Sequence, residues 1–337
     1  MNRARGTLRH LTRRVDRWLN GGCGILTYHR VATVKHDPWS LAVRPERFAE
    51  QLEVLRRVGA VMTIDRMTRA LRAGTLPRRA IAITFDDGYA DNLLTAKPLL
   101  ERHEVPASIF LCTGLLVGRG SFWWDALLWV LTEPETLPSQ MEISLDGQTY
   151  NLTLENLEEA KAPADRNWEP PPTSRHATYR ELCDLLRPLT AQAQSEAVAE
   201  VAAWAGVNLP EMPDNRPLSR AEAATLIDGG LIEIGAHTLT HPDLPAIAAG
   251  LQRDEIIRSK ADCEEIAGRP VTSFAYPHGR HAPETVKLVR EAGFCAACTT
   301  AAGFVRKSTD PFLLPRIQVL DWDGAEFERR IETIIFP

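Results

Sequence analysis

The chain has 337 residues, of which 44% are hydrophobic and 25% are charged, and its formal net charge is −5. This is the composition of an ordinary globular protein with a large core, and it excludes a disordered chain or a small scaffold held by disulfides. The nearly balanced charge, with a pI of about 6.0, also argues against a nucleic-acid binder, which needs a basic surface. Several of the six cysteines lie in apolar runs, so we expect no disulfide framework.

Residues 1–20 contain six arginines and one acidic residue. Leu8, Leu11 and Val15 recur at helical spacing, which predicts a short basic amphipathic helix that lies on an anionic membrane surface. The alternative is a helix that is solvated or packed on the rest of the protein. The segment lacks the apolar core of a secretory signal, and no stretch is long enough to span a bilayer. We therefore expect a cytoplasmic protein, with peripheral contact to the inner membrane as an option.

From Gly24 onward, short apolar runs alternate with helical stretches, which is typical of repeated βα units and a parallel sheet. The first helix is predicted at 45–58, because a proline suits the first turn and Phe48, Leu52 and Leu55 line one face. Eight strands are predicted, at 25–28, 61–64, 80–85, 107–112, 231–236, 273–276, 295–299 and 317–320.

The stretch from 115 to 218 breaks this rhythm. It contains an aromatic cluster, a β-like patch at 141–154, a proline-rich loop at 163–172 and a helical stretch at 178–204. A structureless loop of that length is implausible inside a compact domain. The sequence therefore predicts an α/β barrel made of residues 21–114 and 219–337, with an inserted cap subdomain at 115–218.

Residues 80–89, AIAITFDDGY, predict a buried strand that ends in Asp86, Asp87 and Gly88. Side chains alternate along a strand, so adjacent aspartates converge on one site only where the strand has ended and the backbone turns, which glycine permits. Carboxylates at the C-terminal end of a barrel strand are typical of a catalytic site. The alternative is a turn that caps the following helix.

Residues 232–241, IEIGAHTLTH, predict a second buried strand, followed by His237 and His241. This spacing places two imidazoles on one side of a helical turn. Alone, the pair is equally compatible with two surface histidines. Two imidazoles and one carboxylate oxygen, however, form a ligand set suited to Zn²⁺ or a similar ion, with positions left open for water and substrate. The two strand ends together predict a catalytic metal site.

These residues resemble the polysaccharide deacetylase family, also called the NodB homology or carbohydrate esterase 4 family. Residues 84–88 (TFDDG) match its first motif, 237–241 (HTLTH) its second, and 273–279 (SFAYPHG) a variant of its third. The resemblance covers about residues 24–114 and 219–320. It implies a distorted (β/α)7 barrel that hydrolyses an N-acyl group from an amino sugar. The insertion resembles that of members linked to cell-surface glycan or amino-sugar biosynthesis.

Carried over by position, the resemblance implies that Asp87, His237 and His241 ligate a divalent metal, for which we expect Zn²⁺. Asp86 would be the general base, and the backbone N–H of His278 would stabilise the oxyanion. A metal lowers the pKa of bound water towards about 7, so a carboxylate can remove its proton near neutrality.

The third motif departs from the family pattern, because Ala275 occupies the position of an arginine that usually braces the catalytic aspartate. Arg316 is our candidate for a cation that orients Asp86 instead. We also place Arg316 and Tyr276 among the residues expected at the substrate.

The family's C-terminal histidine, which supplies the general acid, is also missing, since no histidine follows His281. We predict that His29, at the end of the first strand, protonates the leaving amine, because imidazole titrates near neutrality. His278 is the rival for this role, and a purely structural His29 is the alternative.

In the insertion, residues 121–125 (SFWWD) concentrate aromatic side chains. Trp123 and Trp124 are predicted to stack on a sugar ring, and Asp125 to accept its hydroxyls or an amine. The alternative is a hydrophobic anchor that fastens the cap to the barrel.

The sequence thus predicts a metal-dependent hydrolase that removes an N-acetyl group, or as a second choice an N-formyl group, from an amino sugar. The sugar would belong to a glycan, a sugar nucleotide or a lipid-linked intermediate. Two alternatives are a hydrolase of a non-carbohydrate amide and a catalytically silent glycan-binding barrel. The sugar, its carrier and the oligomeric state do not follow from the sequence.

Overall fold

A parallel sheet forms the centre of the molecule in the computed structural model, which describes residues 23–154, 171, 173–212 and 215–334. Seven strands follow one path, in the order β11-β10-β9-β6-β5-β1-β12, and β4 pairs with β5 beside it. Every pair in this sheet is parallel, as the alternating pattern predicted. The strands are β1 (Gly24–Tyr28), β4 (Ala60–Met62), β5 (Ala80–Phe85), β6 (Ala107–Leu111), β9 (Ile232–Ala236), β10 (Ser273–Ala275), β11 (Ala296–Cys298) and β12 (Ile317–Gln318).

The sheet curves into a distorted barrel. Strand β5 pairs with β1 along one edge, and its other edge is shared between β4, at residues 80–82, and β6, at residues 84–85. The ring closes just before β12, where Leu314 exchanges backbone hydrogen bonds with Ala297 and Thr299 (2.9 Å each). Strand β12 then pairs with β1.

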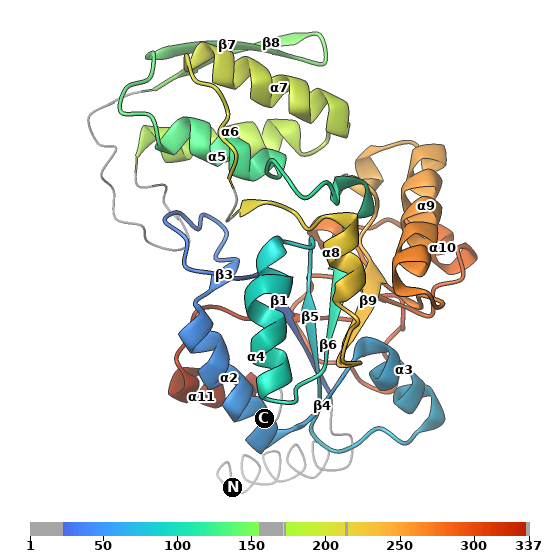
Figure 1. The fold of residues 1–337 in the computed structure, drawn as a ribbon. Coiled ribbons are helices and arrows are strands. Elements are labelled where there is room, and N and C mark those ends of the chain that lie inside the picture. Colours follow the sequence, from blue (N-terminus) through green and yellow to red (C-terminus); the bar gives the residue numbers. More distant parts are fainter. Residues whose placement is uncertain (1–22, 155–170, 172, 213–214, 335–337) are drawn as a thin grey trace, which may run out of the picture.

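Helices cover the outside of this sheet (Figure 1). Helix α2 (Pro45–Val58) has the predicted bounds and buries the predicted apolar face. The other helices around the barrel are α3 (Ile64–Ala73), α4 (Lys97–Arg102), α8 (Arg220–Thr225), α9 (Ala249–Ala267), α10 (Pro283–Glu291) and α11 (Gly324–Ile334). Short helical turns are η1 (Asn92–Ala96), η2 (Thr113–Leu115), η5 (Leu244–Ala246) and η6 (Pro277–Gly279).

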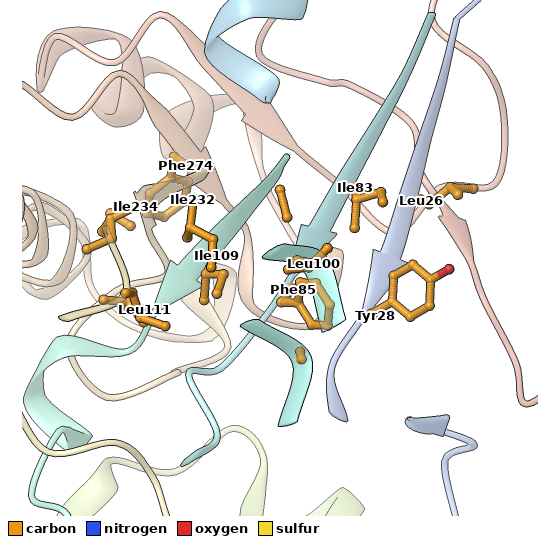
Figure 2. Close-up of a cluster of buried hydrophobic side chains, with 14 of the residues drawn as sticks. Leu26, Tyr28, Ile83, Phe85, Leu100, Ile109, Leu111, Ile232, Ile234 and Phe274 are labelled. Atoms are coloured by element: carbon orange, nitrogen blue, oxygen red, sulfur yellow. The ribbon is translucent and has the colours of Figure 1, made fainter. Parts of the chain in front are cut away.

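The barrel strands are buried on both faces, which explains their uninterrupted apolar runs. Leu26, Ile83 and Ile109 belong to the main core cluster between the sheet and the helices (Figure 2). Side chains alternate along a strand, so the neighbouring residues Ile25 and Ala82 point to the other face of the sheet. There they belong to a second hydrophobic cluster, which is rich in small side chains.

The inserted stretch has a hydrophobic cluster of its own, and Figure 1 shows its elements gathered beyond one end of the barrel. The β-like patch predicted at 141–154 is an antiparallel hairpin, and the helical stretch predicted at 178–204 is two helices. The elements are α5 (Trp123–Thr132), β7 (Gln140–Leu145), β8 (Gln148–Thr153), α6 (Ser174–Leu186) and α7 (Ala191–Trp204). The cap limits at 115–218 stay a prediction, and the loop predicted at 163–172 lies almost wholly outside the described residues.

Several strands differ from the sequence prediction, and those predicted at 295–299 and 317–320 are shorter, at 296–298 and 317–318. The strand predicted at 61–64 ends earlier, because the Thr63 side chain accepts a hydrogen bond from Arg66 N and starts α3 at Ile64. The short strands β2 (Arg30–Val31) and β3 (Ala42–Val43) were not predicted. The predicted amphipathic segment 1–20 lies outside the described residues. Among the helices that the structure describes, none is long and apolar enough to cross a membrane.

Candidate metal centre and active site

Asp86 and Asp87 follow β5 at the edge of the sheet where the parallel strands end. The ladder to β1 continues one step beyond the strand, with Asp86 N donating to Tyr28 O (3.1 Å). The chain then turns sharply, with φ values of 73° at Asp87 and 83° at Gly88. A Cβ at Gly88 would meet the side chain of Leu111 at 2.9 Å, so this close turn requires glycine. The turn is what lets both carboxylates converge on one site.

The two histidines follow β9, but they do not lie on a helical turn, so this detail of the prediction is wrong. Residues 237–241 form a loop in which Thr238 (φ 69°) and His241 (φ 60°) are left-handed. The hydroxyl oxygen of Thr238 accepts a hydrogen bond from His241 N (3.0 Å), which closes the loop locally. The loop, not a helix, brings both imidazoles to the same side.

Glu255, on α9, fixes this loop from outside. Its carboxylate accepts hydrogen bonds from the backbone N–H groups of Leu239 (2.8 Å) and Thr240 (3.0 Å) and from the Thr240 hydroxyl (2.7 Å). The role of Glu255 could not be predicted from the sequence, because an acid on a polar helix carries no local signal of such a role.

The imidazoles of His237 and His241 both approach the same carboxylate oxygen of Asp87. The Oδ1 atom of Asp87 lies 3.5 Å from Nε2 of both histidines, and all three side chains are buried. This separation is too long for a good hydrogen bond, but two ligands that each lie about 2.1 Å from a tetrahedral cation are about 3.4 Å apart. His237 Nδ1 donates to Ala275 O (2.8 Å), because a carbonyl only accepts, and this leaves the Nε2 lone pair facing the site. Each histidine is thus spaced from Asp87 as two ligands of one divalent cation are.

Cys112 is a second candidate for the third ligand, because Asp87, Cys112 and His237 each place a donor atom within 4.8 Å of the others. The Cys112 thiol, however, donates to His237 O (3.3 Å), and burial raises its pKa well above the ordinary value. Burial lowers the pKa of His241 well below its ordinary value, as does the nearby His278, so His241 is the neutral imidazole that a metal ligand must be. We therefore favour His241.

Arg316 forms a two-point ion pair with Asp86, over 2.8 Å (Nη1 to Oδ1) and 2.7 Å (Nη2 to Oδ2). Its remaining donors bind Thr299 O (2.9 Å) and the Thr84 hydroxyl (3.2 Å), and its side chain is 1% exposed. Burial alone would raise the pKa of Asp86, but the charge and hydrogen bonds of Arg316 lower it to about 2. Arg316 is thus placed to orient Asp86, and its predicted contact with substrate is wrong because the guanidinium is buried and bonded to Asp86, Thr84 and Thr299.

His29 lies beside Asp86, since β1 and β5 pair with Tyr28 opposite Phe85. The distance from His29 Nε2 to Asp86 Oδ2 is 4.0 Å, and the His29 side chain is 17% exposed. His29 therefore has access both to the carboxylate and to solvent.

The His278 ring packs edge-on against His241, with a centroid distance of 4.4 Å. Burial lowers the pKa of His278 to about 4, and the positive charge of Arg187 adds to this effect. His278 thus lies at the site, as predicted, but as a neutral imidazole near pH 7.

Tyr276, in contrast, does not reach the site. It is fully buried, its hydroxyl donates to Phe312 O (3.1 Å), and its ring packs against Phe274 (5.3 Å). The prediction that Tyr276 binds substrate is wrong, because the side chain points into the core between the sheet and the helices.

The start of α5 brings the predicted aromatic residues to the candidate metal centre. The ring of Trp124 lies 5.0 Å from that of His241, and Phe122 stacks on Trp124 at 4.8 Å. Trp124 Nε1 donates to the Tyr89 hydroxyl, which donates to Asp125 Oδ2 (2.8 Å each). Burial raises the pKa of Asp125 to about 6.

Trp123 is partly exposed and packs both on the hydrophobic cluster of the insertion and on the cluster around Trp124. It therefore joins the insertion to the site.

Backbone strain is concentrated at this centre. Among the described residues, eight other than glycine have positive φ, and four of them are Asp87, Thr238, His241 and His278. Such conformations cost free energy and persist where the surrounding structure enforces them, typically at functional sites.

A family model described as polysaccharide deacetylase matches residues 73–140 and 175–297, more than half of the chain. YxkH of Bacillus subtilis is 28% identical over 104 residues, which are 31% of this chain and 37% of YxkH. The poly-beta-1,6-N-acetyl-D-glucosamine N-deacetylase of Escherichia coli K12 is 32% identical over 92 residues, 27% of this chain and 14% of that protein. The aligned stretches thus cover well under half of both relatives.

Solved structures show the same fold. The deacetylase PplD of Streptococcus pyogenes, in complex with acetate, superposes with a TM-score of 0.59 over 92% of this chain and 98% of PplD, at 17% identity. IcaB of Ammonifex degensii superposes with a TM-score of 0.57 over 92% of this chain and 96% of IcaB, at 20% identity. These likenesses confirm the predicted (β/α)7 barrel. Since the family model matches more than half of its residues, the chain belongs to the polysaccharide deacetylase family.

Proposed function

We propose that this protein is a metal-dependent hydrolase that removes an N-acetyl group from an amino sugar of a glycan. The observation that carries the proposal is the convergence of Asp87, His237 and His241, with Asp87 Oδ1 at 3.5 Å from both imidazoles. Membership of the polysaccharide deacetylase family supports it, as does a relative that is named as an N-acetyl-D-glucosamine polymer deacetylase.

Asp87, His237 and His241 would hold the cation, for which we propose Zn²⁺. When bound, it would polarise the amide carbonyl and make an attacking water more acidic. Asp86 takes the proton of that water, because the ion pair with Arg316 keeps it ionised and holds both of its oxygens in place. A positioned base of this kind contributes roughly 10² to 10⁴-fold to the rate.

Breaking the C–N bond releases acetate and requires a proton on the departing nitrogen. We assign this proton to His29, which lies 4.0 Å from Asp86 and is partly exposed. His278 is the weaker candidate, because its lowered pKa leaves it neutral near pH 7. The backbone N–H of His278 would bind the oxyanion of the tetrahedral intermediate.

The start of α5 would bind the sugar. Trp124 forms a wall beside His241, and the stacked Phe122 already covers one face of its indole. We assign to Trp123 the contact with a sugar face and to Asp125, whose Oδ2 is held by the Tyr89 hydroxyl, the contact with sugar hydroxyls or the new amine.

Three further assignments remain part of the proposal. The N-formyl group is the second choice of leaving acyl group. A sugar nucleotide or a lipid-linked sugar is an alternative to the glycan. A cytoplasmic location, with membrane contact through residues 1–20, rests on the sequence alone.

The test is release of acetate from N-acetylated glycans, sugar nucleotides and lipid-linked sugars, measured with protein that is stripped by a chelator and then reloaded with Zn²⁺. We expect activity on at least one class, loss on stripping and recovery on reloading. Asp86→Asn serves as the inactive control. Release only from non-carbohydrate amides would favour the alternative hydrolase, and binding of glycans without any release would favour the silent barrel.

A further inference from the structure

The turn between β1 and β2, which carries His29, is tied to the segment that follows the two catalytic-site aspartates. Asn92 Nδ2 donates to His29 O (2.8 Å). Asp91 accepts from Val31 N (3.0 Å) through one oxygen and from Arg30 Nε (2.9 Å) through the other. Asp91 and Asn92 are both buried, and neither has a place in the chemistry described above.

The hydrogen bond from Asn92 lies just beyond the last backbone hydrogen bond between β1 and β5. The backbone ladder between β1 and β5 ends with the bond from Asp86 N to Tyr28 O, and the carbonyl of the following residue, His29 O, accepts from the Asn92 side chain. Asn92 is the first residue of η1, a π-helical turn that packs against β2. Such turns widen a helix by one residue and occur frequently at functional sites.

The side chain of Asn92 also has an unpaired end. Its Oδ1 is buried and has no hydrogen-bond partner among the residues that the structure describes, while Nδ2 binds His29 O and Asp91 Oδ1. An unpaired buried acceptor is destabilising. The hydrogen bonds that hold this side chain are therefore those of Nδ2, to His29 O and Asp91 Oδ1.

We propose that Asn92 is a positioning residue for His29, and this rests on the proposed function in which His29 supplies the proton to the leaving amine. By holding the His29 carbonyl, Asn92 fixes the end of β1, and so keeps the imidazole at its distance from Asp86. Misplacing a catalytic group by about 1 Å can cost about 10²-fold in rate.

The test uses the zinc-loaded, full-length protein and the variant Asn92→Ser, whose hydroxyl is too short to reach the His29 carbonyl. Asn215→Ala is the matched control, because it removes an amide that also binds this turn, but at the Arg30 side chain (2.8 Å). We expect Asn92→Ser to shift the NMR signals of the His29 imidazole and to lower kcat about tenfold with little change in KM. Asn215→Ala should leave both unchanged.

A double-mutant cycle with His29→Ala separates positioning from general stability. If Asn92 acts through His29, Asn92→Ser has no further effect on kcat in the His29→Ala background. An equal fall in both backgrounds, or unshifted His29 signals, overturns the inference. Asn92→Asp keeps the volume and replaces the donor with an acceptor, so it serves if the serine variant does not fold, and failure of both to fold also overturns the inference. If the wild type releases no acetate from any substrate, the proposed function fails. In that case the NMR signals of the His29 imidazole alone test whether Asn92 positions His29.

Discussion

Single substitutions can distinguish His241 from Cys112 as the proposed third metal ligand. We expect His241→Ala and Asp87→Ala to lose bound Zn²⁺ and activity, because each removes a donor from the set that meets at 3.5 Å. Cys112→Ser and Asp86→Asn should keep the metal, and only Asp86→Asn should lose most activity, since an amide cannot accept the proton. The measurement is metal content of the purified variants. Metal loss in Cys112→Ser with retention in His241→Ala would reverse the assignment.

The Asp86–Arg316 pair predicts a change in pH dependence. In Arg316→Met the desolvation of Asp86, the largest influence on its pKa, is opposed only by the charges of His237 and His29, so we expect this pKa to rise from about 2 to above the ordinary value. The acid limb of the kcat/KM profile should then move to higher pH. Breaking a buried ion pair of this kind typically costs about 3–5 kcal/mol of stability.

The sign of the pH effect on stability also changes. In the wild type, the lowered pKa of Asp86 gives stability that is present above its ordinary pKa and is lost as pH falls towards 2. In Arg316→Met, the raised pKa makes the protein less stable as pH rises through it. Melting temperatures at several pH values test this, and Arg316→Lys, which keeps the charge, should lie between the two. An unmoved acid limb in Arg316→Met would contradict this account of Asp86.

At the scale of elements, strand β9, which His237 directly follows, is packed too tightly for a side chain at Gly235. A Cβ there would lie 2.4 Å from the buried ring of Phe110 and 2.9 Å from the Ser273 hydroxyl. We expect Gly235→Ala to destabilise the protein by about 1–3 kcal/mol through overpacking. It should also weaken metal binding, because β9 must shift and His237 lies two residues further on.

The matched control is Gly250→Ala on α9, where a new Cβ meets no atom within 4 Å. Alanine is a better helix former than glycine, so this variant should be as stable as the wild type or slightly more so. Thermal unfolding and a zinc titration of both variants provide the measurement. Equal melting temperatures for Gly235→Ala and the wild type would show that β9 has room to move.

At the scale of the whole molecule, the arginine-rich segment 1–20 predicts membrane binding. Each arginine near an anionic surface gains on the order of 1 kcal/mol, and the apolar residues of the segment add burial. We expect the full chain to sediment with anionic liposomes at low salt but not at high salt. A chain that starts at Cys23 should remain in solution and keep its activity on a soluble substrate. Loss of that activity on truncation would instead make the segment part of the barrel.

Much of the architecture was predictable from local patterns. Strand β5 and helix α2 have the predicted bounds, because a fully apolar run and a one-sided apolar helix each identify their element without reference to the rest of the chain. The strand ending at Met62 was less predictable, since the Thr63 cap that ends it depends on backbone geometry. The two-residue strands β2 and β3 are too short to show any periodicity.

The sequence by itself determined the residue types of the site and the strands that precede them, because Asp86, Asp87 and His237 directly follow buried apolar runs and His241 lies four residues beyond His237. Only the tertiary structure decided which groups support them. Arg316 reaches Asp86 across 230 positions of sequence, because Arg316 directly precedes β12, which pairs with β1, and β1 in turn pairs with β5. Glu255 and Tyr276 also show this dependence on tertiary structure. Glu255, a polar helix residue without a sequence signal, binds the histidine loop, whereas Tyr276, a residue of the third motif, turns into the core. Side-chain periodicity is a local property of the chain, whereas hydrogen-bond partners depend on where distant strands and helices meet.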